Sequence, residues 1–98
     1  MAADDEVRVV DNQREQRFEI WADRRRAGLV DYGLQPGALV LIHTEIDPAF
    51  EGRGLGSRLI HDVLAEIRAR GLRIVPVCPF VRAYLRRHPE ERDIVRDP

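Results

Sequence analysis

The stretch that decides the fold of this chain is Phe50-Glu51-Gly52-Arg53-Gly54-Leu55-Gly56-Ser57. It lies between a strand-like run that ends at Ile46 and a helix-like run that begins near Leu55. The first N–H groups of a helix have no partners inside the helix, and the helix dipole adds partial positive charge at the same end. Glycines let a backbone approach a ligand closely, and Arg53 adds a full positive charge. The stretch therefore predicts a site for a phosphorylated ligand.

A strand, a helix and a second strand surround this stretch. Residues 38–46 begin as an apolar run, which is typical of a central strand, and end in the polar residues His43-Thr44-Glu45. Apolar residues then recur at helical spacing from residue 55 until Gly71 supplies a stop. Residues 73–78 form another short apolar run. This order predicts a right-handed β-α-β crossover whose two strands are parallel.

The segments before residue 38 predict further strands joined by turns. Residues 7–10 are a candidate edge strand. A second strand begins at Phe18, residues 23–26 turn the chain, and residues 27–34 return it as a hairpin. Pro36-Gly37 makes the next turn. The predicted fold class is therefore α/β (α+β), with a mixed, mostly antiparallel sheet.

The ends and the length of the chain complete the predicted architecture. Pro79 can begin a last helix that His88-Pro89 ends, and Ile94 and Val95 then offer a docking point. Residues 1–6 are small and acidic and are expected to form a flexible tail. The 98 residues contain no repeat and no linker, so we expect a single domain spanning residues 1–98.

Composition indicates a cytoplasmic protein that has no membrane partner. Hydrophobic residues make up 44% of the chain and charged residues 34%, which is ordinary for a globular protein. No apolar run approaches the roughly 18 residues of a membrane span, and we identify no signal peptide. Cys78 is the only cysteine, so no internal disulfide can form. The three histidines and this cysteine lack paired-ligand spacing, so no metal site is expected.

Positive charge is concentrated in the second half of the chain. Residues 51–98 hold ten Arg and seven acidic residues, whereas residues 1–50 hold six Arg and ten acidic residues. Every basic residue is Arg, which suits phosphate binding, although genome base composition explains the same bias more simply. Aromatic residues are scarce and do not interleave with a basic stripe, so nucleic acid is not an expected partner.

The order of these motifs resembles the acetyl-CoA-binding region of the GNAT acyltransferase superfamily. The resemblance runs from Leu39 to about Pro89 and is closest to the small, cysteine-containing branch, whose members are around this length. Its motifs are His43-Thr44-Glu45, Gly52-Arg53-Gly54-Leu55-Gly56, Val77-Cys78-Pro79-Phe80 with Tyr84, and His88-Pro89-Glu90. The set is more specific than the glycine pattern alone, because its order along the chain is hard to reproduce by chance.

The resemblance implies a minimal GNAT fold whose central strands splay apart to admit the pantetheine arm of acetyl-CoA. Backbone near Ile46 would contact the pantetheine and the thioester. The residues whose backbone N–H groups would bind the diphosphate are Arg53, Gly54, Leu55, Gly56 and Ser57. Glu51 departs from the Gln or Arg usual at its position and is expected to point outward. No room exists before Phe18 for the two helices that commonly wall the acceptor site, so we expect an open cleft.

Acetyl transfer to an amine needs a neutral nucleophile, a stabilised oxyanion and a proton for the thiolate. Glu45 and His43 share one strand parity, and either could take a proton from an ammonium, with Glu45 favoured. As alternatives, Glu45 would cap the sheet end or pair with an Arg there, and His43 would be a hydrogen-bonded interior residue. Cys78 precedes a helix N-terminus, where a thiol can act as a nucleophile, or it is structural or contacts the cofactor. The resemblance implies that Tyr84 protonates the CoA thiolate, with core packing as the alternative.

We therefore predict an acetyl-CoA-dependent N-acetyltransferase with an unidentified amine acceptor. The alternative is a non-catalytic module or sensor that binds CoA or acyl-CoA. The absence of helices that wall the acceptor site and the departure from the usual motif at Glu51 favour this alternative. A protein-interaction domain without a cofactor would leave the glycine pattern unexplained. His61 is expected to be solvated and dispensable. The run Arg24-Arg25-Arg26 is expected to be a solvated hairpin tip, with acceptor recognition as the alternative.

Overall fold

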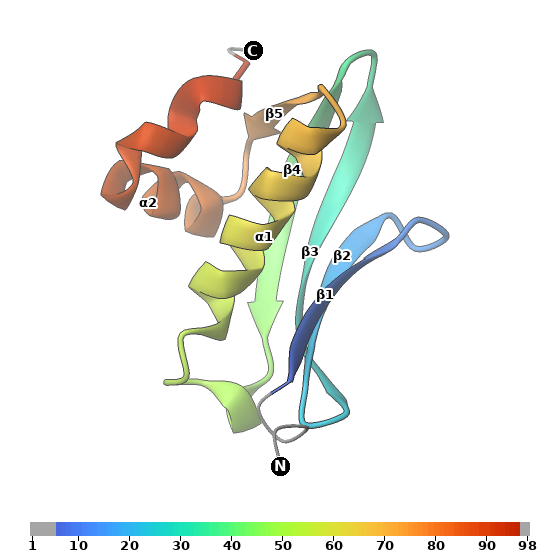
Figure 1. Ribbon diagram of the computed structural model, residues 1–98, viewed down its shortest axis with the longest axis vertical. Helices are drawn as coiled ribbons and strands as arrows, with labels where there is room; N and C mark the ends of the chain where they lie inside the picture. Colours follow the sequence, from blue (N-terminus) through green and yellow to red (C-terminus); the bar gives the residue numbers. More distant parts are fainter. Residues whose placement is uncertain (1–5, 97–98) are drawn as a thin grey trace.

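The computed structural model describes residues 6–96 as a single sheet with helices packed on one face (Figure 1). The sheet has five strands in the order β1-β2-β3-β4-β5. The strands are β1 Val7–Asn12, β2 Arg17–Ala22, β3 Arg25–Gln35, β4 Ala38–Ile46 and β5 Arg73–Pro76. The helices are α1 Leu55–Ala69 and α2 Pro79–Arg87, with short 3-10 helices η2 Pro48–Phe50 and η3 Pro89–Ile94. The predicted tail lies outside the described residues except for Glu6.

Strand pairing confirms the predicted mixed, mostly antiparallel sheet. β1, β2, β3 and β4 form successive antiparallel pairs. β5 then pairs with β4 in parallel, after the chain has crossed over through α1. The strand–helix–strand unit predicted from the sequence is therefore present, and its two strands are neighbours.

Several strand boundaries differ from the prediction. β1 continues to Asn12 instead of ending at residue 10. The turn between β2 and β3 contains only Asp23 and Arg24, at φ of 53° and 65°, so Arg25 and Arg26 belong to β3. Two-residue turns with both residues at positive φ match the twist of the strands that they join. β5 ends at Pro76 rather than at residue 78, because the N–H groups of Val77 and Cys78 both turn to the carbonyl oxygen of Leu41.

The core lies between the sheet and the two helices. α1 buries one stripe at helical spacing, made of Leu55, Gly56, Leu59, Ile60, Val63, Leu64 and Ile67. The strands meet it with Phe18, Ile20, Val30, Tyr32, Leu39 and Leu41. Each large apolar side chain buried in this way contributes about 1.5–3 kcal/mol. Among residues 6–96, no helix has both the length and the apolarity that crossing a bilayer requires.

The segment after α2 docks on the outer edge of β5. Ile94 is buried, Val95 forms a parallel bridge with Ile74, and the Arg96 N–H donates to the Ile74 carbonyl oxygen at 2.8 Å. This confirms the docking point predicted at Ile94 and Val95, although η3 itself was not predicted. The segment covers hydrogen-bonding groups of β5 that would otherwise form an exposed sheet edge.

Candidate functional site

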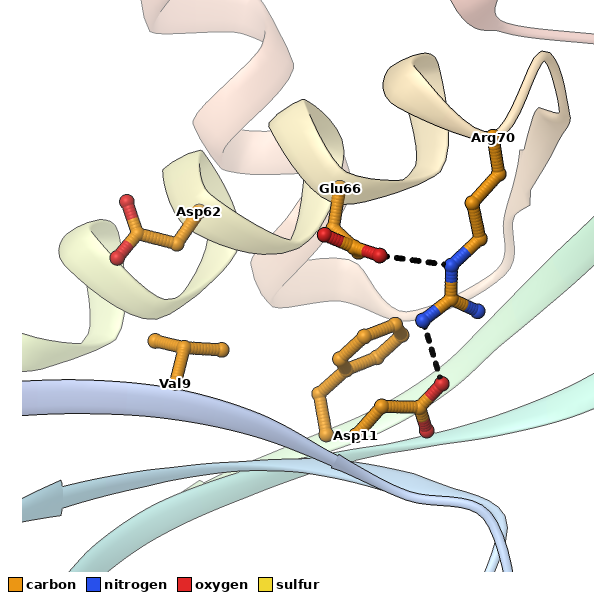
Figure 2. Close-up of a pocket in the computed structure, with 6 residues that line it drawn as sticks. Val9, Asp11, Asp62, Glu66 and Arg70 are labelled. Carbon is orange, nitrogen blue, oxygen red and sulfur yellow. Dashed lines mark hydrogen bonds and ion pairs between the residues drawn. The ribbon is translucent and has the colours of Figure 1, made fainter.

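A cavity of about 350 Å³ lies between β1 and α1, away from the glycine-rich stretch (Figure 2). Arg70 crosses it and binds Asp11 at 2.8 Å and Glu66 at 2.9 Å. Asp11 also accepts a hydrogen bond from Tyr32 at 2.6 Å. These charged groups satisfy one another and fasten β1 to α1, so this cavity has a structural explanation.

A second cavity, of about 340 Å³, opens at the glycine-rich stretch, and we call it the loop cavity. It is lined by Ile46 at the end of β4, by residues 50–52 and 54–57, and by Phe80 and Arg87 of α2. All of the predicted cofactor-binding residues except Arg53 line it. Glu51 is exposed and also lines this cavity.

The first turn of α1 presents unused hydrogen-bond donors to the loop cavity. Gly54 is the N-cap at φ 74° and provides no side-chain cap, and the first turn holds no acidic residue. The Gly54 carbonyl oxygen accepts the first helical bond, from Arg58 at 3.1 Å. Within residues 6–96, the N–H groups of Leu55, Gly56 and Ser57 have no acceptor. Free donors at the positive end of a helix dipole suit an anionic ligand.

The loop requires glycine at different positions for different physical reasons. Gly52 and Gly54 have φ of 84° and 74°, and a Cβ added at either would meet nothing within 4 Å. They supply a left-handed backbone and leave the space above it open. A Cβ at Gly56 would lie 2.6 Å from Cζ of Phe80. The expectation that Gly56 makes room for a ligand is therefore corrected, because the ring of Phe80 occupies that space.

Arg87, rather than Arg53, is the cation that lines the loop cavity. The Arg53 guanidinium binds Asp23 at 2.8 Å and lies over the ring of Phe50 at 5.3 Å. Arg25 lies over the same ring at 5.1 Å, so the β2–β3 turn packs against the loop instead of being only a solvated tip. None of the ion pairs among residues 6–96 includes Arg87. The sequence does not distinguish Arg87 from Arg82 or Arg86, because nothing in its neighbourhood differs from theirs.

β4 and β5 diverge beside the loop cavity, as the fold prediction required. Their pairing ends at Leu41, whose carbonyl oxygen accepts from Val77 at 3.0 Å and from Cys78 at 2.9 Å. From Ile42 to Ile46, β4 pairs only with β3. The backbone of this segment therefore has a free edge on the side from which β5 has departed.

A β-bulge in β4 decides where the polar end of this strand points. Tyr32 pairs with Leu41 and Asp31 pairs with His43, so Ile42 has no opposite residue. Strict alternation from buried Leu41 would turn His43 toward the core. The extra residue reverses that order, so His43 and Glu45 share the helix-free face, while Thr44, opposite buried Val30, faces the helices.

His43 and Glu45 lie together, as their shared parity predicts. His43 Nε2 and Glu45 Oε2 are 3.0 Å apart, and the side chains are 55% and 64% exposed. His43 is therefore not an interior residue, and Glu45 pairs with His43 rather than with an arginine. The pair can accept a proton from a group that approaches the helix-free face.

Cys78 lies on the opposite side of β4 from this pair. It is the N-cap of α2, only 2% exposed, and its Sγ is 3.2 Å from Oγ1 of Thr44. Thr44 was not proposed as a site residue, although a polar residue in an apolar strand could have indicated it. Burial limits access of reagents to this thiol.

Tyr84 belongs to a polar network that joins α2 to η3 and α1. It is 2% exposed, and its hydroxyl donates to Glu91 at 2.5 Å. Burial and the Glu91 carboxylate raise the pKa of Tyr84 well above its ordinary value. His61 is exposed as predicted, but its Nδ1 lies 3.2 Å from Glu91. Tyr84 is thus a core residue and does not line the loop cavity.

Within the described part of the chain, no group of three or more His, Cys, Asp or Glu residues is arranged to hold a metal ion.

Comparison with known proteins gives a consistent result. A family model described as GCN5-related N-acetyl-transferase matches residues 17–94. The solution structure of a GCN5-like protein from Staphylococcus aureus is similar at a TM-score of 0.69 and 20% identity, covering 97% of this chain and 91% of that chain. The crystal structure of the ribosomal-protein-S18-alanine N-acetyltransferase from Escherichia coli is similar at a TM-score of 0.57 and 18% identity. The match covers 76% of this chain and 45% of that chain. No curated protein matches. At these identities the solved structures show the fold alone.

Proposed function

Since this chain belongs to the GCN5-related N-acetyltransferase family, we propose that it binds acetyl-CoA in the loop cavity and transfers the acetyl group to an amine. The observation that carries the proposal is the set of free N–H groups at Leu55, Gly56 and Ser57, next to the free edge of β4. One feature suits the diphosphate of CoA and the other suits its amide-containing arm.

Several residues support cofactor binding in this position. The first-turn N–H groups would donate to the diphosphate, with Gly52 and Gly54 leaving the approach open. Arg87 would supply the full positive charge. The free edge of β4 between Ile42 and Ile46, on the side away from β3, would hydrogen-bond the pantetheine amides as an added strand would. Glu51 opposes phosphate binding by its charge, and exposure to solvent weakens that opposition.

The pair His43 and Glu45 would prepare the amine. Glu45 would take one proton from the ammonium, while His43 holds the carboxylate in place at 3.0 Å. The neutral nitrogen would then bond to the thioester carbon, and the carbon–sulfur bond would break. The nitrogen would release its second proton to solvent, and the departing thiolate would take a proton from solvent. The bulge at Ile42 leaves backbone without a ladder partner, which supports an oxyanion-binding role for an N–H group at that point.

Cys78 and Tyr84 receive supporting roles in this proposal. The buried contact of Cys78 with Thr44 favours a structural or cofactor-contacting thiol over an acetylated one. The hydrogen bond from Tyr84 to Glu91 favours packing of α2 over protonation of the thiolate. A cytoplasmic location is also proposed, because a single cysteine suits a reducing compartment.

A non-catalytic CoA-binding protein is the second candidate. Residues 13–16 alone join β1 to β2, so the fold has no helices there to wall an acceptor site. Such a protein would bind CoA without turning over.

Release of CoA thiol from acetyl-CoA in the presence of a panel of amines tests the proposal. We expect turnover that falls about 100-fold in Glu45→Gln, within the range for a lost general base. Glu90→Gln, which removes an exposed carboxylate from η3, is the matched control and should behave as wild type. Thermal stabilisation by CoA without turnover would favour the second candidate, and no stabilisation by CoA or acetyl-CoA would exclude both.

A further inference from the structure

A separate hollow of about 230 Å³ opens where β3 begins and β4 ends. Residues 26–29 and residues 45–48 line it. It shares Ile46 with the loop cavity, so only the end of β4 separates the two. A molecule in this hollow would lie next to the segment of β4 that we propose contacts the thioester.

The charged groups of the hollow have both signs. Glu45 and Asp47 contribute carboxylates, and in each of them one oxygen is engaged, by His43 and by the Ala49 N–H respectively. Each carboxylate therefore keeps a second oxygen for a ligand. Arg26 contributes a guanidinium on the same hollow.

The guanidinium of Arg26 is available to a ligand. Its Nη1 forms an ion pair with Oε2 of Glu19 at 3.8 Å, which is longer than a hydrogen bond, so the N–H groups of Arg26 remain free to donate to a ligand. Glu19 is already satisfied by three other side chains, those of Asn12, Arg17 and Trp21. Burial alone would raise the pKa of Glu19, but those hydrogen bonds outweigh it and lower the pKa, so Glu19 stays ionised without Arg26.

We propose that this hollow, the acceptor hollow, binds the acyl acceptor, and that the acceptor is a compact zwitterion: a primary amine that also carries a carboxylate or a similar anion. The proposal rests on the proposed function and specifies its substrate class. The ammonium would lie at Glu45 and Asp47, and the anion at Arg26. Leu29, 8% exposed, gives the carbon chain between them an apolar surface.

The size of the acceptor hollow also favours a compact ligand. Its volume is below the range of about 300–1,000 Å³ that drug-sized ligands occupy. Placing the ammonium at Glu45 brings it within reach of the base that would deprotonate it. A dication of the same length would place its second charge against Arg26, which like-charge repulsion disfavours.

The test uses three probes of similar length: 4-aminobutanoate, butylamine and 1,4-diaminobutane. Each is titrated into the full chain saturated with CoA, and backbone amide NMR shifts report where it binds and how tightly. We expect shifts at residues 26–29 and 45–48, with 4-aminobutanoate bound about tenfold more tightly than butylamine, the effect of one charged hydrogen bond. Arg26→Gln should abolish that preference. Arg24→Gln, which changes an arginine that lines a different hollow, should keep it.

Three outcomes would overturn the acceptor hollow: equal affinities for 4-aminobutanoate and butylamine, a preference that survives Arg26→Gln, or shifts located elsewhere. Failure of CoA itself to shift the amides of residues 54–57 would instead refute the proposed function. In that event the same titration of the CoA-free chain still decides whether the acceptor hollow binds the zwitterion.

Discussion

The loop glycines show that residues of one type can be required for unrelated reasons. Gly52 and Gly54 are required by their positive φ, whereas Gly56 is required by the ring of Phe80 on another helix. The sequence indicates the first reason, because a glycine before a helix is a local signal. It cannot indicate the second, which depends on where α2 folds back.

Replacing Gly56 with Ala tests the contact with Phe80. We expect a loss of about 1 kcal/mol of unfolding free energy, the lower end for overpacking, because the ring of Phe80 is 38% exposed and can move. In a Phe80→Ala background the same replacement should cost almost nothing. A double-mutant cycle by urea unfolding measures the difference. Equal costs in both backgrounds would show that the two residues are not coupled.

Replacing Arg87 with Gln tests which cation serves the phosphates. We expect CoA affinity to fall about tenfold, since a hydrogen bond between charged groups is lost. Its dependence on salt should also become weaker. Arg53→Gln should change affinity by less than about threefold, because the exposed pair with Asp23 contributes little. Arg86→Gln is the matched control on α2, and calorimetry gives all three constants. A larger loss at Arg53 than at Arg87 would reverse the assignment.

The buried Cys78 permits a prediction about the route of transfer. Because its thiol contacts Thr44 and is 2% exposed, we expect intact mass to remain unchanged after incubation with acetyl-CoA. Cys78→Ala should retain turnover with the amine panel. Acetylation of Cys78, together with loss of turnover in the variant, would establish a covalent route instead.

At the level of elements, the bulge in β4 determines which polar side chains of this strand lie on each face of the sheet. Sequence parity correctly places His43 and Glu45 on one face, but it cannot say which face once an extra residue enters the strand. Ile42 has no compositional feature that marks it as a bulge. The consequence is that the proposed base faces the open side, where an acceptor can arrive.

A second element-level feature is the network around Glu91. Its carboxylate receives the hydroxyl of Tyr84 and contacts His61 on α1, and Arg68 of α1 lies 3.9 Å away. Burial alone would raise the pKa of Glu91, but these partners outweigh it and lower the pKa below 4.5. The network thus links three helical segments, α1, α2 and η3, whose contacts no local sequence pattern indicates.

The lowered pKa of Glu91 gives a pH dependence of stability. Near the ordinary pKa of 4.5, the folded state binds fewer protons than the unfolded state. The Glu91 carboxylate therefore stabilises the fold above that pH, and this stabilisation is lost as the pH falls through the pKa of Glu91 in the folded state. Lowering the pH from 7 into the acid range should therefore reduce the free energy of unfolding less in Glu91→Gln than in the wild type. Urea unfolding at each pH measures both losses. An identical acid loss in both proteins would contradict the assignment.

At the level of the whole molecule, local patterns predicted the architecture and missed the long-range contacts. The helical period of α1, the glycine stop after it and the turn residues were sufficient for the mixed sheet and its parallel crossover. Contacts such as Arg53 with Asp23, thirty residues apart, depend on how the hairpin meets the loop. No local pattern encodes them.

The arrangement places the loop cavity and the acceptor hollow at the same end of the sheet, with Ile46 common to both. The connection between β1 and β2 contains no helix, and within residues 6–96 the helices cover only the other face of the sheet (Figure 1). Donor and acceptor could therefore enter from different directions without competing for space.

The most direct measurement compares CoA with pantetheine in a backbone amide NMR titration. Pantetheine has the amide-containing arm and the thiol of CoA but lacks its diphosphate. We predict that CoA shifts the N–H signals of Leu55, Gly56 and Ser57 strongly and that pantetheine leaves them unchanged, while both ligands shift residues 42–46. If CoA left those three signals in place, or if pantetheine moved them equally, diphosphate binding at the start of α1 would be contradicted.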